Sequence, residues 1–418
     1  FSLFFPEKRG FFTQDASLFT FGGIMQSPLP FFSRRIGLAD DGGKVDILAG
    51  VKLTGRAGPW TVGLLDVQTA EHAGVDSKNL LVARVAHQVL EESTVGMIFT
   101  RGEPRINGNS SLVGADFNYA NNRLPGGKSL TGSAAVQFTD SDYVGRRGRS
   151  AIFKVNYPNE PYSLFSWFNS VSQYYDPALG FISRQGVNKI HLSHRYRWYF
   201  SDRLLRRTDV TVETDDTLDG RGRRLERNYV LPGIEVFTVA NDSMAANLQD
   251  HMEVLDDPFE IRPGIVIPAG RYHWNPARVV FDTSSSRPVD VRVEYQRGGF
   301  FNGTRNDYRA HFGWRPSNRI QLSLSYSLNQ VRLPQGNFDA RVSEAKASYT
   351  FSPDLQLSLL AQHDNLSEDL GLNFRIKWIV QPGSEVFFIV NEGYDTTARY
   401  FRPTQVESSL KGSWTFRF

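Results

Sequence analysis

The sequence predicts an all-β protein, a transmembrane antiparallel β-barrel of the outer-membrane type, from three observations. Apolar and polar side chains alternate from about residue 44 onward, as in the run Ile320-Gln321-Leu322-Ser323-Leu324. Short clusters of turn-forming residues separate such runs. No apolar run approaches the roughly 18–20 residues of a membrane helix. Because a period of two places successive side chains on opposite faces, each strand has one face for lipid and one for water.

The composition agrees with this fold class. The chain has 418 residues with a mean hydropathy of −0.35, which suits a barrel because half of each strand is polar. Its 31 Phe, 16 Tyr and 7 Trp are enough for aromatic girdles at two lipid–water boundaries. The balance of 47 basic and 44 acidic residues gives no reason to expect nucleic acid. Without cysteine, disulfides and thiolate metal sites are excluded.

The predicted strands follow one another at regular spacing to the end of the chain. They begin near Lys44, Trp60, Lys78, Thr94, Ser111, Lys128, Arg149, Tyr162, Val187, Leu205, Leu225, Ser243, Tyr272, Pro288, Arg305, Ile320, Arg341, Leu355, Leu370, Glu385 and Thr404. A barrel with both chain ends in the periplasm needs an even number of strands. We therefore expect about 22 strands, with 20 as the alternative. Residues 17–30 either supply the missing strand or thread the lumen.

The connections between the strands alternate in length. Tight turns at 158–161 and 352–354 alternate with longer connections such as 177–186, 256–270 and 300–306. Barrels of this type have short periplasmic turns and long outer loops. The tight turns are therefore predicted at the periplasmic end.

Two regions are predicted, an N-terminal segment (1–43) and the barrel (44–418). The segment does not alternate, and aromatic pairs flank its charged clusters. Because charged side chains face lipid only at high cost, these clusters are expected in the lumen or at its periplasmic mouth. One hypothesis is a constriction, and the other is a latch that pairs with wall carboxylates such as Glu213 or Glu294. The charged residues are Glu7, Lys8, Arg9, Arg34 and Arg35.

Several short motifs resemble a large family of uncharacterised bacterial outer-membrane barrels. They include Phe4-Phe5-Pro6-Glu7-Lys8-Arg9-Gly10-Phe11-Phe12, Pro30-Phe31-Phe32-Ser33-Arg34-Arg35-Ile36-Gly37, the stretch 50–63, Gln381-Pro382-Gly383 and Val390-Asn391-Glu392-Gly393-Tyr394. The resemblance covers essentially the whole chain and implies a fold and a location, but no activity. Family members usually carry a family-9-type carbohydrate-binding domain before the barrel, which these residues lack. They also usually have proline where Gly10 stands.

The inferred lumen face carries charges of both signs. One interpretation is a polar conduit with a mild anion preference, because basic residues are in excess. The other is a set of cross-strand ion pairs that stiffen the wall. The candidate lumen and selectivity residues are Arg34, Arg35, Lys189, Arg195, Arg197, Arg292, Glu294, Arg309, Arg375 and Lys377.

The sequence offers little for catalysis or metal binding. His363 and Asp364 are adjacent on a strand, so they point to opposite faces and cannot pair directly. His191 and His194 likewise lie on opposite faces, which argues against a metal shared by these two. The loop-like stretch 215–220 is a weak calcium candidate. We expect neither an enzyme nor a bound cofactor.

The last strand ends on alternating aromatic residues, Trp414, Phe416 and Phe418. They resemble the signal that the barrel-assembly machinery reads, although Gly412 departs from its usual spacing. No signal peptide precedes Phe1, so we expect the numbering to begin after cleavage or after a segment not included.

Two functions remain for a bacterial outer-membrane protein of this kind. The first is a porin-like channel for small polar solutes with a partly occluded lumen. The second is a barrel that anchors an upstream domain or a partner complex. The expected partners are outer-membrane lipid, lipopolysaccharide, the assembly machinery, and a protein at the outer loops or the periplasmic mouth.

Overall fold

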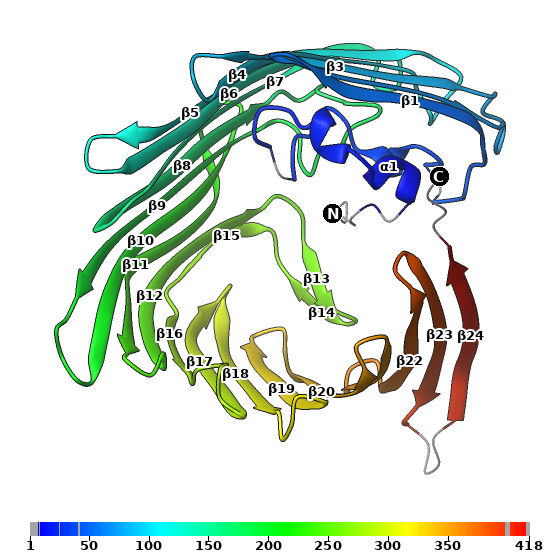
Figure 1. Ribbon diagram of the computed structural model, residues 1–418. Coiled ribbons are helices and arrows are strands. Elements are labelled where there is room, and N and C mark those ends of the chain that lie inside the picture. Colours follow the sequence, from blue (N-terminus) through cyan, green and yellow to red (C-terminus); the bar gives the residue numbers. More distant parts are fainter. Residues whose placement is uncertain (1–6, 8, 25, 41, 398–401, 415–418) are drawn as a thin grey trace. The chain divides into compact units, whose positions relative to one another are not determined.

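The computed structural model describes residues 7, 9–24, 26–40, 42–397 and 402–414. Within these residues, 22 strands belong to one sheet, and the other two strands form a separate hairpin, β13–β14. Strands that follow one another in the chain pair as antiparallel hairpins, as β1 does with β2 and β22 with β23 (Figure 1). The predicted all-β, antiparallel fold class with about 22 strands is therefore confirmed.

The chain divides into two compact units, Phe1–Tyr196 with Val212–Arg227, and Arg197–Thr211 with Asn228–Phe418. Eight strands lie wholly in the first unit, and β9, β10 and β11 have residues in both. These strands are β1 Ile47–Ala57, β2 Trp60–Thr69, β3 Asn79–Val89, β4 Ser93–Arg101, β5 Ser110–Leu124, β6 Lys128–Ser141, β7 Arg146–Pro158, β8 Tyr162–Val171, β9 Val187–Tyr199, β10 Leu205–Asp219 and β11 Arg224–Thr238.

The remaining strands all belong to the second unit. They are β12 Ser243–Leu255, β13 Phe259–Arg262, β14 Ile265–Ile267, β15 Gly270–Trp274, β16 Ala277–Asp282, β17 Val289–Phe300, β18 Gly303–Trp314, β19 Ile320–Leu333, β20 Gly336–Ser352, β21 Leu355–Asp364, β22 Asp369–Gln381, β23 Ser384–Asp395 and β24 Arg402–Ser413. Strands β15 and β16 pair with successive parts of β12, so they continue one another across Asn275 and Pro276. The single strand predicted near Tyr272 is thus made of two pieces, since proline has no N–H to donate to the ladder.

Two connections differ from the sequence prediction. Residues 256–270, expected to be an outer loop, contain the hairpin β13–β14. Residues 300–306, expected to be a long linker, are mostly strand, because β17 and β18 pair as far as Phe300 and Gly303. Phe301 supports this tight turn in a left-handed conformation at φ 50°.

The N-terminal segment folds into short helical turns instead of a strand. They are α1 Gly10–Thr13, η1 Ala16–Phe19 and η2 Ser33–Arg35. None of the helical segments in the described part of the chain has the length and hydrophobicity needed to cross a membrane. Of the two roles considered for residues 17–30, their described part therefore does not supply a further strand to the sheet.

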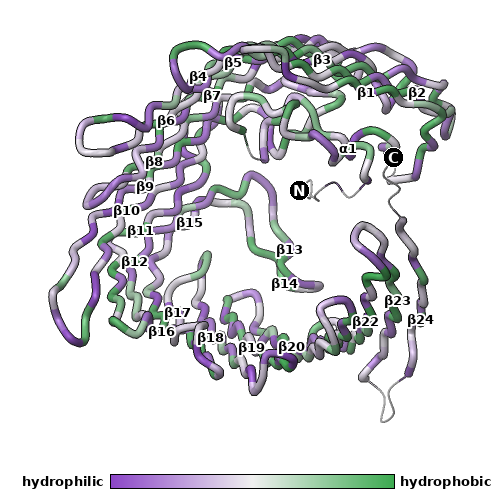
Figure 2. Tube along the Cα trace, in the orientation of Figure 1, coloured by the Kyte–Doolittle hydropathy of each residue, from purple (hydrophilic) through white to green (hydrophobic). Residues whose placement is uncertain are grey.

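Hydrophobic and hydrophilic residues alternate along the strands of the second unit (Figure 2), so its sheet has two chemically distinct faces. Along β19, Leu324 and Tyr326 are exposed, with exposed fractions of 59% and 41%. Val331 lies on the opposite face and packs against Ile267 of the hairpin β13–β14. We call the face that carries this hairpin the inner face. Because side chains alternate along a strand, the inner face of β19 also carries Ser325 and Ser327.

Candidate functional site on the inner face

The N-terminal segment lies against one face of the strands of the first unit, which we call the inner face of that unit (Figure 1). Its buried side chains form one cluster with the apolar side chains of β2–β5, and Phe19 is the clearest contact. A Cβ added at Gly63 of β2 would lie 3.0 Å from the Phe19 ring, so the wall is shaped to admit it. The cluster contains Phe12, Phe19, Phe21, Ile36, Leu65, Val67, Leu80, Val82, Ile98 and Leu112. Each such side chain contributes about 1.5–3 kcal/mol when fully buried.

A buried ion pair anchors the segment to the wall. Arg84 of β3 and Asp116 of β5 are 2.7 Å apart, and their side chains are only 4% and 0% exposed. Asp116 also accepts a hydrogen bond from the Gly22 backbone N–H at 3.0 Å. Arg84 donates through Nε to the Thr20 carbonyl at 3.0 Å. Removing either charge would leave its partner buried and unpaired, so these contacts hold residues 20–22 in place.

A second buried cluster joins the β8–β9 connection to the wall. Arg105 pairs with Glu103 and Asp176, each at 2.6 Å, and all three side chains are at most 8% exposed. Burial opposes ionisation of Asp176, but hydrogen bonds from Arg105 and Ser141 outweigh it and lower the pKa of this carboxyl. Burial also opposes the charge on Arg105, yet Glu103 and Asp176 raise the pKa of its guanidinium. Arg105 and Asp176 are therefore both charged at neutral pH.

The β8–β9 connection in turn holds the N-terminal segment. Leu29 and Phe181 form a reciprocal backbone bridge with N–H···O distances of 2.8 and 3.0 Å. Arg35 donates to the Gly180 carbonyl at 3.2 Å. Burial, followed by repulsion from Arg105, lowers the pKa of the Arg35 guanidinium. Arg34, the other predicted selectivity residue of the segment, is half-buried.

The predicted constriction residues mainly contact their own segment. Glu7 and Arg9 pair at 2.7 Å, and Ser33 donates to Glu7 at 2.7 Å. Arg9 also donates to the Ile36 carbonyl at 2.8 Å. These bonds brace the segment internally, which differs from the hypothesis of pairing with Glu213 or Glu294. Lys8 lies outside the described residues.

The inner face of the second unit is polar and charged. Glu294 of β17 is its centre, with Arg278 at 2.9 Å, Arg309 at 2.6 Å and Arg292 at 3.6 Å. Glu294 is 5% exposed, whereas Arg309 and Arg292 are 53% and 46% exposed. The carboxylate is thus covered by guanidinium groups that themselves remain in contact with solvent. This pattern fits both sequence interpretations, the charged conduit and the cross-strand ion pairs.

The other predicted lumen residues are spread along the wall. Arg197 pairs with Asp209 at 2.7 Å. Lys377 pairs with Glu385 at 3.0 Å, and Arg375 lies over the Phe387 ring at 4.8 Å. Lys189 and Arg195 are half-buried on β9. The structure therefore brings Arg292, Glu294 and Arg309 into one ion cluster, and it places Arg375 and Lys377 over the same Phe387 ring.

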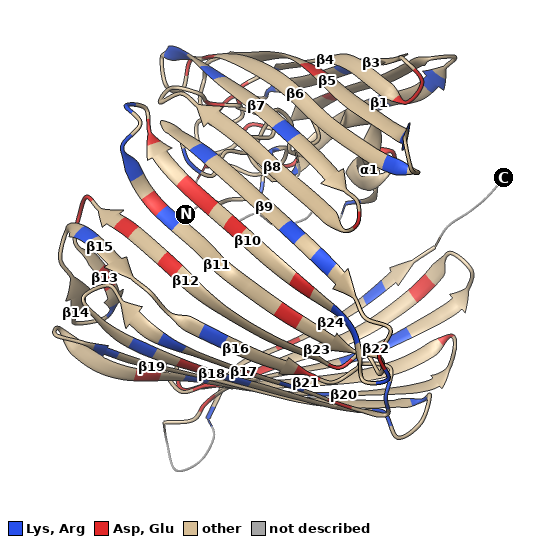
Figure 3. Ribbon diagram, turned by 90° about the vertical axis from the view of Figure 1, so that its left-hand side faces the viewer, with Lys and Arg blue, Asp and Glu red and all other residues tan. Residues whose placement is uncertain are grey.

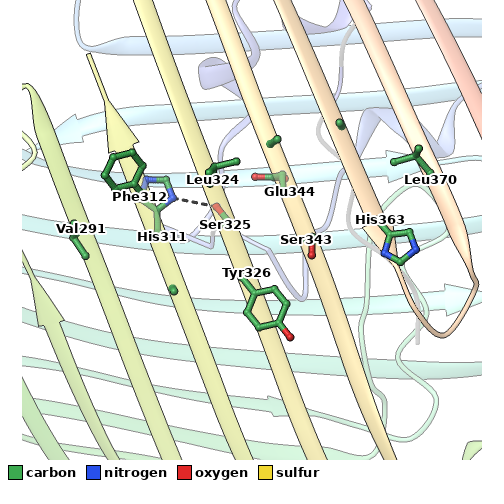
Figure 4. Close-up of a pocket in the computed structure, with 13 residues that line it drawn as sticks. Val291, His311, Phe312, Leu324, Ser325, Tyr326, Ser343, Glu344, His363 and Leu370 are labelled. Carbon is green, nitrogen blue, oxygen red and sulfur yellow. Dashed lines mark hydrogen bonds between the residues drawn. The ribbon is translucent and has the colours of Figure 1, made fainter. Parts of the chain in front are cut away.

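The opposite face of the second unit has a shallow apolar pocket (Figure 4). It lies between Phe312, Leu324 and Tyr326 and over small residues such as Ala345. The only hydrogen bond between the residues drawn there joins His311 Nδ1 to Ser325 Oγ at 3.0 Å. The side chains that line the pocket on this face are mainly apolar, which suits an acyl chain.

Two features of the inner face were not predicted. The first is the hairpin β13–β14, for which the short apolar run Ile265-Val266-Ile267 was an available signal. The second is a contact between His191 of β9 and Asp215 of β10, 2.9 Å apart. Of the predicted assembly signal, Trp414 is exposed, while Phe416 and Phe418 lie outside the described residues.

Comparisons with known proteins add little to this description. No protein-family model and no curated protein matches the chain. Among solved structures, the copper transporter OprC is similar, with 9% sequence identity and a TM-score of 0.41. The similarity covers 88% of this chain and 70% of that one. At this identity and TM-score it supports no inference about function.

Proposed function

We propose that this chain is a bacterial outer-membrane barrel that conducts small polar solutes, with part of its inner face closed by its own N-terminal segment. The observation that carries the proposal is the charged, solvent-contacting inner face of β17 and β18, opposite an apolar face. An apolar outer face suits lipid, and a polar inner face suits water and ions. In this proposal, outer-membrane lipid and lipopolysaccharide surround the barrel, and the assembly machinery inserts it.

The experiment is a planar-bilayer recording of the wild type and of a variant without residues 1–16. Removal of α1 and its flanking charges widens the path, so single-channel conductance should rise. Neutralising Arg34 and Arg35 to glutamine should weaken the anion preference, because charges at a narrow point dominate selectivity. Conductance that is unchanged by the deletion would contradict a constriction in this segment.

The scaffold is the second candidate, and the packed inner face of the first unit favours it. Buried apolar side chains and two buried ion clusters are costly to rearrange, which suits a static support. A barrel that is silent in bilayers both before and after the deletion would favour this function. A partner would then be sought at the outer loops or at the periplasmic mouth.

The proposed orientation places the tight turns in the periplasm. The turn between β7 and β8 is short, whereas the β8–β9 connection runs from Val171 to Val187. Protease added to intact cells should spare residues 158–161 and cut only outer connections such as 394–403. Cleavage at 158–161 in sealed cells would reverse this orientation.

A further inference from the structure

A cluster of potential metal ligands lies on β9 and β10 within the first unit. His191, Glu213 and Asp215 each offer one ligand atom, and these atoms all lie within 4.8 Å of one another. Figure 3 shows β9 with basic positions beside a β10 rich in acidic ones. His191 on β9 stands opposite Trp167 on β8. Lys189 and Asn169 form the cross-strand pair two residues away, so they lie on the same face as His191. Asn169 contacts the N-terminal segment through the Ser27 carbonyl, so the cluster belongs to the inner face.

The distances suit a small divalent ion after modest movement. His191 Nδ1 and Asp215 Oδ1 are 2.9 Å apart. Zinc binds histidine nitrogen and carboxylate oxygen at about 2.0–2.2 Å, which places neighbouring ligands about 3 Å apart. The His191 side chain is 11% exposed and that of Asp215 is 46% exposed. One side of the cluster is therefore enclosed by protein, and the other is open to water as a further ligand.

The imidazole is held in a fixed orientation before any ion binds. Its ring stacks on Trp167 with a centroid distance of 5.6 Å and an interplanar angle of 13°. The Phe165 ring lies 5.5 Å away. Ser166 donates through Oγ to the His191 carbonyl at 3.0 Å. Outer contacts that orient a ligand commonly raise metal affinity, because less freedom is lost on binding.

The charges also favour a cation. Glu213 and Asp215 place two carboxylates beside one imidazole. The nearby Arg224 and Arg227 form ion pairs with the adjacent Asp216. Magnesium and calcium prefer oxygen ligands throughout, whereas imidazole selects zinc, copper, nickel and iron. We propose that His191, Glu213 and Asp215 form a binding site for a divalent transition-metal ion, with Zn²⁺ as the representative ion. The site does not depend on whether the barrel conducts.

The test uses the full, untagged chain, refolded in detergent and stripped with a chelator. Zn²⁺ is titrated by isothermal calorimetry, and bound metal is counted by elemental analysis after desalting. The wild type should retain one Zn²⁺ per chain. His191→Ala, Glu213→Gln and Asp215→Asn should each lower the affinity at least tenfold. His194→Ala is the matched control, because His194 is on the same strand and contacts Tyr162 instead, and it should bind as the wild type does.

A wild type that retains no zinc, or a His191→Ala variant that binds as tightly, would overturn the proposal and leave an ordinary His–Asp hydrogen bond. If the variants fail to fold, X-ray absorption on the zinc-loaded wild type decides. One imidazole with oxygen ligands at about 2.0–2.2 Å is expected. A shell of oxygen alone, or of several imidazoles, would overturn the assignment.

Discussion

The inner faces of the two units differ in whether their side chains are buried or in contact with solvent. In the first unit, Leu65 and Val67 of β2 are fully buried beneath the N-terminal segment, and Arg84 and Asp116 form a buried ion pair. In the second unit, the corresponding face carries Glu294 with guanidinium groups that remain exposed. The comparison shows that one hairpin sheet can present either a packed core or a solvated wall. Whether a face is packed or solvated depends on whether apolar or charged side chains occupy the alternate positions that point to it.

The difference between buried and solvated ion pairs gives the largest expected effect. Asp116→Ala leaves Arg84 buried without its partner and should lower the free energy of unfolding by about 3–5 kcal/mol. Asp282→Ala in the second unit breaks a pair with Arg292 whose side chains are 30% and 46% exposed, so the loss should stay within about 1 kcal/mol. Urea unfolding of the folded protein in lipid vesicles measures both. Equal losses of unfolding free energy for the two variants would contradict the distinction between a buried ion pair in the first unit and a solvated one in the second.

The contrast between outer and inner faces predicts a somewhat smaller effect. Leu324→Arg puts a charge on the apolar face of β19 and should cost about 2–4 kcal/mol near mid-bilayer. Ser325→Arg is the matched control, because it is the next residue and stands opposite Glu344 on β20. A cross-strand pair of opposite charge should keep its cost within about 1 kcal/mol. The same unfolding assay compares the two variants. A larger loss of stability for Ser325→Arg than for Leu324→Arg would mean that the lipid-facing and inner faces have been assigned the wrong way round.

The acid response of the first unit is the smallest of these effects. The pKa of Asp176 is lowered in the folded state, so its stabilisation is full above its ordinary pKa of 3.8. That stabilisation is lost as the pH falls through the lowered value. Asp176→Asn should therefore flatten the stability curve below about pH 4. Asp202→Asn is the exposed control in the second unit, where backbone N–H groups of Leu204 and Leu205 lower the pKa. It should change the curve less, and equal changes would count against a special role for burial.

The sequence predicted the strands well because alternation and turn chemistry are local signals. All but one of the predicted starts fall within three residues of the observed ones, and the exception, Arg341, misses because β20 begins at Gly336. The prediction of a loop at 256–270 failed because residues 265–267 pack against Val331, a contact distant in sequence.

The candidate site was predicted less completely than the fold. Arg292, Glu294 and Arg309 alternate along paired strands, so their meeting follows from register. The packing of the N-terminal segment on the inner face of the first unit could not be predicted from the pattern of any single strand. A signal was present in β2, where Leu64 and Leu65 are adjacent and both faces are apolar. Apolar side chains on both faces of a strand indicate cover on both sides, here lipid on one face in the proposed setting and residues 12–36 on the other.

The most direct test of the account compares water access to the two inner faces. The chain has no cysteine, so single cysteines can be introduced without background. Ser133 of β6 is 6% exposed, and a Cβ at Gly23 of the segment would lie 3.2 Å from its Oγ. Ser327 of β19 stands opposite Arg309 on the polar face. A membrane-impermeant thiosulfonate reagent, applied to the barrel in lipid, should modify Ser327→Cys rapidly and leave Ser133→Cys unmodified. Equal labelling of both cysteines in the intact chain, or of Ser133→Cys alone, would contradict the account.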